Sequence, residues 1–314
     1  MLTNFKILLK HKPIFNNALG LVNNIIPKPI LFDVSLRDGL QSLTKEQQNN
    51  VTISDKLEIY NDIVNNYNPE NIEIGSIVSN KLLPIFNDTL EIIKHVNKYK
   101  HNLNTNHYIV IPNSNKLKQV IHFKNNTNFS FISSVSNSFQ IKNTHKSIKQ
   151  NAHDLEYMLH LINTSYLINT KTKLYISCIT ECPIEGKIDK NKIIQAILFY
   201  NNLDIDTICL SDTCGSLTLE EFNYIIEKCI QYNVNIKKLA LHLHVNSENE
   251  NIVEQIIHSA LANNIVQFDV SMLKLGGCPM ILSPSKMSYN LSYNLFYKCY
   301  NNYIINNYIT NNFV

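Results

Sequence analysis

Short apolar runs alternate along the chain with longer segments in which apolar and polar residues follow a helical period. The short runs are rich in β-branched residues and have the length of strands rather than helices. Eight of them predict strands, at residues 30–35, 71–75, 108–111, 129–135, 174–178, 207–210, 239–244 and 267–272.

The amphipathic segments between these runs predict helices on their spacing of apolar residues. They are residues 54–67, 82–99, 152–168, 190–201, 219–231 and 248–263. Strand–helix alternation repeated in this way is typical of the α/β class and predicts a (β/α)8 TIM barrel. A doubly wound open sheet is the alternative. The barrel is favoured because polar motifs recur at the carboxyl ends of many strands, which in a barrel open onto one face.

Length and charge narrow the picture further. The chain of 314 residues has a net charge of +3 and no basic block, so nucleic acid is not an expected partner. No apolar run approaches the length of a membrane span. The odd count of seven cysteines without tandem zinc spacing favours free thiols and a reducing compartment, and we expect a cytoplasmic protein.

The domain organisation expected is an N-terminal extension, residues 1–28, followed by a single catalytic barrel, residues 29–314. The first 27 residues carry Lys6, Lys10 and Lys12 and no acidic side chain. A targeting peptide has some of these features, although it is normally rich in Arg and Ser. Mitochondria are therefore the alternative compartment.

Arg37 is the single arginine among 28 Lys and Arg residues. Its planar fork of donors offers what a lysine ammonium does not. Asp38 follows it directly, and Gly39 is expected to let the backbone turn sharply. A cation, an anion and a turn at the end of a strand indicate part of an active site, whereas a chance surface ion pair is the other interpretation.

His242 and His244 lie at the end of the seventh expected strand. Side chains at i and i+2 of a strand point to the same side, so both imidazoles are expected to share one metal ion. With Asp38 available from the first strand, the set suits a divalent cation that also holds an oxygen-rich substrate. Imidazole alone would equally suit zinc.

Three further motifs carry candidate chemistry. Glu73 stands between isoleucines in the second strand, where it either orients Arg37 or forms a structural buried ion pair. Asp212 and Thr213 end the sixth strand and either bind substrate oxygens or cap the next helix. Cys278 follows two glycines in a loop after strand eight, where a thiol is a candidate acid–base group or an ordinary loop cysteine.

Taken together these motifs resemble the 3-hydroxy-3-methylglutaryl-CoA lyase family of metal-dependent barrels. The resemblance runs from about residue 29 to about residue 297, and its motifs occur in the family's order. They are residues 37–41 (RDGLQ), 72–79 (IEIGSIVS), 177–187 (SCITECPIEGK), 211–215 (SDTCG) and 275–279 (LGGCP). Leu40 within the first motif separates the lyases from related synthases.

The resemblance implies a role for each matching residue. It implies catalytic roles for Arg37 (enolate stabilisation), Glu73 (support of Arg37) and Cys278 (acid–base chemistry). It implies a Mg²⁺ or Mn²⁺ held by Asp38, His242, His244 and Asn290, and a substrate contacted by Gln41, Ser76, Asp212 and Thr213. Residues 280–290 are longer than the family's stretch, which places Asn290 after a short insertion, and Val245-Asn246 replace the usual Asp-Thr.

The activity implied is cleavage of 3-hydroxy-3-methylglutaryl-CoA to acetyl-CoA and acetoacetate, with an acyl-CoA as the small-molecule partner. A homodimer is left open. Two alternatives remain at this point: a related metal-dependent aldolase or acyl-CoA condensing enzyme with another substrate, and a catalytically impaired barrel that acts as a binding protein.

Overall fold

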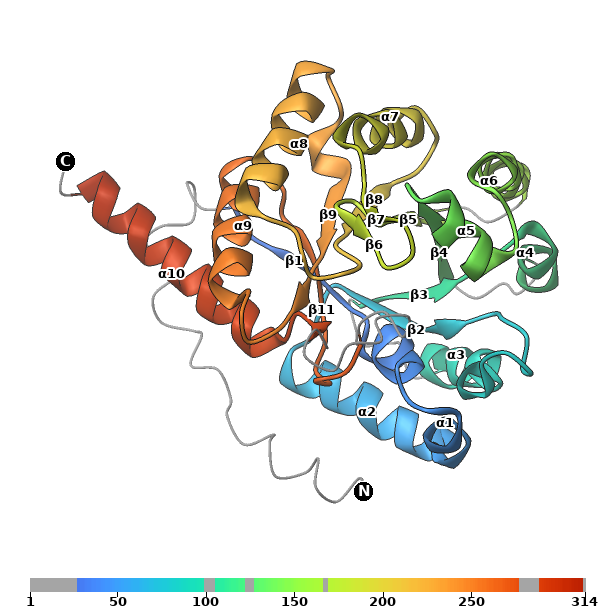
Figure 1. Cartoon of the computed structure of the whole chain (residues 1–314). Helices are drawn as coiled ribbons and strands as arrows, with labels where there is room; N and C mark the ends of the chain where they lie inside the picture. The colour runs from blue at the N-terminus through green and yellow to red at the C-terminus, as the bar shows by residue number, and fades with distance from the viewer. Residues whose placement is uncertain (1–26, 99–104, 122–126, 166–168, 277–287, 313–314) are drawn as a thin grey trace.

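Eight parallel strands close into a barrel in the computed structural model, which describes residues 27–98, 105–121, 127–165, 169–276 and 288–312 (Figure 1). Around the barrel each strand is hydrogen-bonded to the next one in the chain, and the last pairs with the first. The strands are β1 (Ile30–Asp33), β2 (Asn71–Ser76), β3 (Asn106–Val110), β4 (Thr127–Ser134), β5 (Thr172–Ser177), β8 (Thr207–Ser211), β9 (Leu239–His242) and β11 (Gln267–Val270). The predicted TIM barrel and its eight strands are confirmed.

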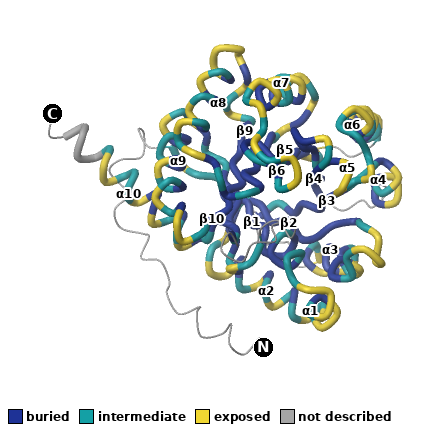
Figure 2. The backbone as a smooth tube through the Cα atoms, in the orientation of Figure 1, coloured by how far each residue is buried: buried dark blue, intermediate teal, exposed yellow. Residues whose placement is uncertain are grey.

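Helices surround the barrel, and their outward faces carry the exposed residues (Figures 1 and 2). They are α1 (Lys45–Asn50), α2 (Ile53–Asn66), α3 (Thr89–Lys98), α4 (Ser114–Val120), α5 (Asn137–Thr144), α6 (Ile148–Thr164), α7 (Lys190–Asn201), α8 (Leu219–Gln231), α9 (Glu250–Ala262) and α10 (Tyr293–Asn312). Four of these, α1, α4, α5 and α10, were not predicted. The first three are short, and α1 has no apolar residue, so a periodic apolar pattern could not reveal them.

Two predicted helices begin at different residues in the structure. The helix expected over 82–99 is a short 3₁₀ turn, Pro84–Phe86, followed by α3 from Thr89. A residue that precedes proline is disfavoured in the helical conformation, and Leu83 has φ −134° and ψ 86°, so the helix cannot include residues 82 and 83. The helix expected from residue 152 begins earlier, at Ile148, because Ser147 and Gln150 form a capping box there.

The predicted strand over 239–244 is wrong at its end. β9 stops at His242, and His244 with Val245 forms β10, which pairs antiparallel with β12 (Tyr289–Asn290) outside the barrel. His244 lies opposite Asn290 in this pair. The chain thus leaves the barrel wall at the point where it brings a distant segment beside the histidines. A second small hairpin, β6 (Glu181–Cys182) with β7 (Gly186–Lys187), extends the loop after β5.

The remaining expectations about the whole chain concern its ends, thiols and membrane contact. The N-terminal extension predicted for residues 1–28 lies outside the described residues except for Pro27 and Lys28. The cysteines within the described ranges are free. No helix in the described part of the chain is long and apolar enough to cross a bilayer.

A buried polar cluster fastens the end of β1 to the end of β11. The carboxylate of Asp33, fully buried, accepts hydrogen bonds from the backbone N–H of Ser35 at 2.8 Å and from its hydroxyl at 3.0 Å. The Ser35 hydroxyl also lies 3.2 Å from that of Ser271 and accepts a bond from the N–H of Met272 at 2.8 Å. These contacts hold together the two loops that carry Arg37 and the segment after residue 271.

Ionisation of Asp33 is predicted to weaken the fold as the pH rises. Burial raises the pKa of Asp33 to about 7, above the value near 4 of an unfolded chain. Between these values the folded state binds more protons than the unfolded state, so stability is full below about pH 4 and is lost as the pH approaches 7. The wild type should lose about 3 to 4 kcal/mol of its free energy of unfolding across that pH window, and Asp33→Asn should not show this loss. Urea unfolding of both proteins at pH 4.5 and 7.5 measures this, and parallel pH profiles would contradict it.

Candidate active site

The loop after β1 presents Arg37 and Asp38 to the mouth of the barrel from a single π-helical turn, Ser35–Gly39. The N–H of Gly39 donates to the carbonyl of Val34 at 3.1 Å, which closes the wide turn. Such turns are rare in proteins as a whole, and many of those that occur lie at functional sites. The expectation that Gly39 makes a sharp bend is wrong, because its φ is not among the positive ones and a side chain there would meet only ordinary contacts.

Arg37 is held from two sides. Its Nε donates to Glu73 on β2, and its Nη1 donates to Asp38 at 2.5 Å. The Tyr175 hydroxyl on β5 lies 3.2 Å from both carboxylate oxygens of Glu73, and the guanidinium lies over the Tyr175 ring at 5.1 Å. Burial of Arg37 would lower its pKa, but the negative charges of the buried Glu73 and the partly buried Asp38 raise it well above the usual value. Of the five donors of a guanidinium, those on Nη2 are left for a ligand by these contacts.

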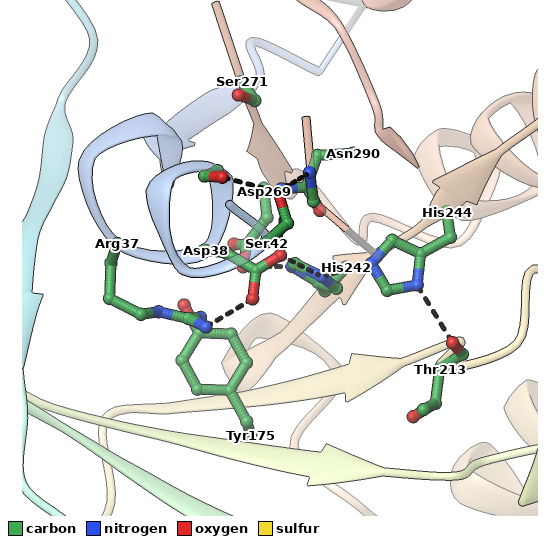
Figure 3. Close-up of polar contacts among 12 residues, drawn as sticks. Arg37, Asp38, Ser42, Tyr175, Thr213, His242, His244, Asp269, Ser271 and Asn290 are labelled. Atoms are coloured by element: carbon green, nitrogen blue, oxygen red, sulfur yellow. Dashed lines mark hydrogen bonds and ion pairs between the residues drawn. The ribbon is translucent and has the colours of Figure 1, made fainter. Parts of the chain in front are cut away.

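His242 and His244 turn the same ring atom toward each other (Figure 3). Nδ1 of His242 lies 3.1 Å from Oδ2 of Asp269, and Nδ1 of His244 lies 2.9 Å from the carbonyl of Asp212. Carboxylates and carbonyls only accept, so each Nδ1 carries the proton. The two Nε2 atoms, 3.2 Å apart, therefore face each other with lone pairs.

Two facing lone pairs repel each other unless a cation lies between them. The pKa of His244 is lowered to about 4, first by burial and then by the neighbouring His242, so His244 itself is neutral near pH 7. Burial opposes the ionisation of Asp38, but the positive charge of Arg37, the largest of the lowering influences, holds its pKa at about 2. Ionised Asp38 places Oδ2 within 4.0 Å of Nε2 of His242.

Asn290 lies beside these three residues and is the candidate for a fourth ligand. It is buried, and its Nδ2 donates to Oδ2 of Asp38 at 2.9 Å. Its Oδ1 is buried without a hydrogen-bond partner in the described part of the chain. An unpaired buried amide oxygen is costly unless something outside the chain binds it. Gly276 makes this arrangement fit, because a Cβ there would lie 2.2 Å from Nδ2 of Asn290.

These donors suit a divalent cation. One ligand atom each from Asp38, His242 and His244 lies within 4.8 Å of the others, and the amide of Asn290 is hydrogen-bonded to Asp38 beside them. In the surrounding network three carboxylates, of Asp38, Glu73 and Asp269, face two cations, of Arg37 and Lys173, so with neutral imidazoles the cluster has one net negative charge. Mixed imidazole and oxygen ligands with open positions fit a Lewis-acid metal.

The remaining predicted substrate residues lie at or near the mouth but are engaged within the protein. The carboxylate of Asp212 accepts from the N–H groups of Ser216 and Leu217 at 3.0 Å each, and burial raises its pKa to about 6. The hydroxyl of Thr213 accepts from the N–H of Cys178 at 2.8 Å. These contacts favour the structural alternative for both side chains without testing a substrate contact.

Ser76 and Gln41 are placed differently. Ser76 is buried at the end of β2, and its hydroxyl donates to the carbonyl of Val110 at 3.1 Å. Gln41 is partly exposed just after the π-helical turn, where its carbonyl accepts from Gln48. The predicted catalytic Cys278 lies outside the described residues. The segment leading to it is fastened at Gly276, whose N–H donates to the hydroxyl of Ser42 at 3.1 Å.

Sequence reasoning missed the residues beneath the site, Tyr175, Lys173 and Asp269. Part of a signal was present, because Asp269 is a charged residue within the predicted strand 267–272 and Lys173 directly precedes the predicted strand 174–178. Charges are almost never fully buried unless they are paired, and two in different strands could have been matched.

The fold and the site together define a (β/α)8-barrel protein with a donor set for a divalent cation at the carboxyl ends of its strands. Ligands and catalytic groups of this fold lie at that face. A family model described as HMGL-like matches residues 28–249. The chain belongs to this HMGL-like family and is a carbon–carbon lyase, and the predicted resemblance is confirmed.

Individual relatives are distant but match most of the chain. A 3-hydroxy-3-isohexenylglutaryl-CoA/hydroxymethylglutaryl-CoA lyase of Pseudomonas aeruginosa is 24% identical over 255 residues, which is 81% of this chain and 80% of the relative. The mitochondrial hydroxymethylglutaryl-CoA lyase of Homo sapiens is 26% identical over 81% of this chain and 74% of its own. A solved HMG-CoA lyase of Acinetobacter baumannii, in complex with coenzyme A and 3-methylmalate, has a TM-score of 0.72 at 22% identity and covers 87% of this chain and 83% of its own.

Crowding of Asn290 is predicted to weaken metal binding. Gly276→Ala places a Cβ against the Asn290 amide at a φ of +111°, so the amide must move. Loss of such support typically costs 10- to 100-fold in metal affinity. Titration with Mn²⁺, followed by the electron paramagnetic resonance of free Mn²⁺, measures the effect.

A matched control exists at Gly186, which also has a positive φ, of +76°, but has nothing within 4 Å of an added Cβ. Gly186→Ala introduces similar backbone strain away from Asn290 and should leave the Mn²⁺ affinity unchanged. Equal affinities in Gly276→Ala and Gly186→Ala would show that Asn290 is not a ligand.

Proposed function

We propose that this chain cleaves 3-hydroxy-3-methylglutaryl-CoA to acetyl-CoA and acetoacetate with the help of Mg²⁺ or Mn²⁺. The observation that carries the proposal is the cluster of Asp38, His242 and His244, with Asn290 hydrogen-bonded to Asp38, beside Arg37, whose Nη2 has no hydrogen bond within the described residues. This set offers a place for a cation and, next to it, a place for a developing negative charge.

The reaction requires three changes in the substrate. The tertiary hydroxyl loses its proton, the bond between C2 and C3 breaks, and the electron pair moves onto the thioester as an enolate that is then protonated at carbon. A divalent cation held by the four ligands would supply Lewis acidity and a template for the hydroxyl and carboxylate oxygens. The buried setting strengthens every charge interaction at this point.

Arg37 meets the charge that develops on the thioester oxygen. Its Nε and Nη1 are fixed by Glu73 and Asp38, so the guanidinium needs no rearrangement when the enolate forms. Preorganised donors of this kind are usually the largest contribution to catalysis. The Tyr175 hydroxyl fixes Glu73 in turn.

Cys278 is proposed to exchange the proton at the enolate carbon. It follows Gly276 and Gly277 in the sequence, and the resemblance to the lyases implies a catalytic thiol at this position. A thiol titrates close enough to neutrality to give or take such a proton. Gly276 at the start of this segment contacts Asn290, which links the loop to the metal ligands.

Relatives at this level of identity share a class of chemistry but can differ in the acyl group of their substrates. A related aldolase or condensing enzyme with another acyl-CoA is the second reading. Purified protein assayed with Mg²⁺ or Mn²⁺ against a panel of 3-hydroxyacyl-CoA thioesters decides between them, with acetoacetate release as the readout. Absence of stoichiometric metal would instead favour a catalytically impaired binding protein.

The cytoplasm stays our expectation for the compartment, with mitochondria as the alternative, and a homodimer stays an open expectation for the assembly. Localisation of a tagged full-length chain and light scattering of the purified protein test these two points.

Replacement of Arg37 by lysine is predicted to reduce turnover strongly. Arg37→Lys keeps the charge but loses the fork that contacts Glu73 and the enolate at once. The expected drop in kcat is roughly 10²- to 10³-fold, as for other lost oxyanion donors. Steady-state kinetics at saturating metal measure the drop, with thermal unfolding to verify the fold. Normal turnover in Arg37→Lys would exclude the enolate role.

Replacement of Cys278 by serine tests whether the thiol takes part. Cys278→Ser should fold and bind Mn²⁺ as the wild type does, because Cys278 is not among the proposed ligands. It should lose about 10²- to 10⁴-fold in turnover, the usual effect of losing an acid–base group. Alkylation of the wild type should inactivate it, and substrate should protect. An active Cys278→Ser variant would favour the reading of another barrel aldolase.

A further inference from the structure

A buried ion pair crosses the barrel interior beneath the metal ligands. Lys173 lies on β5 and Asp269 on β11, strands that are three positions apart around the barrel. Nζ of Lys173 lies 2.5 Å from Oδ1 of Asp269, and both side chains are 1% exposed. The pair therefore spans the inside of the barrel.

Stability alone does not explain such a pair. Removal of two charges from water costs several kcal/mol per ion, and their attraction often only offsets this cost. Lys173 gains some further stabilisation because its ammonium lies 3.3 Å from the centroid of the Phe32 ring and 4.5 Å from that of Tyr175. A buried pair is therefore weak evidence for a role in folding, and its other contacts indicate what it does.

Asp269 connects the pair to the metal site. While Oδ1 contacts Lys173, Oδ2 accepts the Nδ1 proton of His242 at 3.1 Å. The carboxylate is thus held at one oxygen and orients an imidazole with the other. The thiol of Cys209, 3.7 Å from Oδ2, is a weak donor and cannot replace the ammonium.

We propose that Lys173 is a positioning residue of the metal centre, which anchors Asp269 so that the Asp269 carboxylate fixes the tautomer and ring orientation of His242. The inference rests on the metal site of the proposed function. With Nδ1 of His242 engaged, Nε2 faces Nε2 of His244 and the carboxylate of Asp38. Without Lys173, Asp269 keeps the contact to the ring that it must orient and the weak contact to the Cys209 thiol, both through Oδ2, so the carboxylate and the ring can rotate together.

The test compares Mn²⁺ affinities of Lys173→Met, Asp269→Asn and the double variant with that of the wild type. Methionine is close to lysine in length but has no charge. Each single variant should bind Mn²⁺ 10- to 100-fold more weakly, the usual effect of losing support for a metal-ligating histidine. The Mn²⁺ affinity of the double variant should equal that of the single variant that binds Mn²⁺ less tightly, because Lys173 acts through Asp269. The visible spectrum of the Co²⁺-loaded proteins should change in parallel.

Lys56 provides the matched control. It is also a buried lysine, 3% exposed, with Nζ 2.6 Å from Oδ1 of Asp88, but it packs between α2 and the turn before α3. Lys56→Met should lower the unfolding temperature and leave both the Mn²⁺ affinity and the Co²⁺ spectrum unchanged. This control distinguishes the general effect of losing a buried lysine from the specific effect of losing Lys173.

Several outcomes would overturn the inference. Wild-type Mn²⁺ affinity in folded Lys173→Met would do so while leaving the proposed function intact. Fully additive losses in the double variant would exclude the route through Asp269. If Lys173→Met does not fold, the double variant is measured in its place, because it leaves no unpaired buried charge. A wild-type Mn²⁺ affinity in the double variant would then overturn the inference. A wild type that binds no Mn²⁺ would instead refute the metal site of the proposed function.

Discussion

The site depends on the convergence of two imidazole lone pairs at the mouth of the barrel. His242 and His244 are each held through Nδ1 by an acceptor, so both Nε2 atoms face one point at a separation of 3.2 Å. This repulsion remains in the protein, and the amide oxygen of Asn290 is buried without a partner among the described residues. Groups that oppose each other in the free protein are satisfied together by one divalent cation, which is why the arrangement indicates a function rather than a packing solution.

Charge inside the barrel is organised around that point in two branches. One branch runs from Tyr175 through Glu73 to Arg37 and ends where a substrate oxygen would lie. The other runs from Lys173 through Asp269 to the first histidine. Each carboxylate has a cation on one side, so neither remains an unpaired buried charge. The branches hold Arg37 and the two histidines side by side at the mouth of the barrel, which is the arrangement on which the proposed cleavage depends.

The short β10–β12 pair has an importance beyond its size. By leaving the barrel wall after β9, the chain sets His244 opposite Asn290, which is remote in sequence. Val245, where the family usually has an acidic residue, is buried opposite Tyr289 in this pair. The departure from the family pattern therefore lies in the element that delivers Asn290, and it replaces a polar group by apolar packing at that element.

The sequence by itself determined the barrel, its eight strands and the group of Arg37, Asp38, His242 and His244. Short apolar runs and helical patterns are local, and the carboxyl ends of parallel strands must meet at one face, so these residues could be brought together without coordinates. Only the tertiary structure decided the π-helical turn, the end of β9, the tautomers of the histidines and the contact between Lys173 and Asp269. These depend on hydrogen-bond partners from distant strands, which local pattern cannot specify, because a buried charge finds its partner only once the barrel has closed.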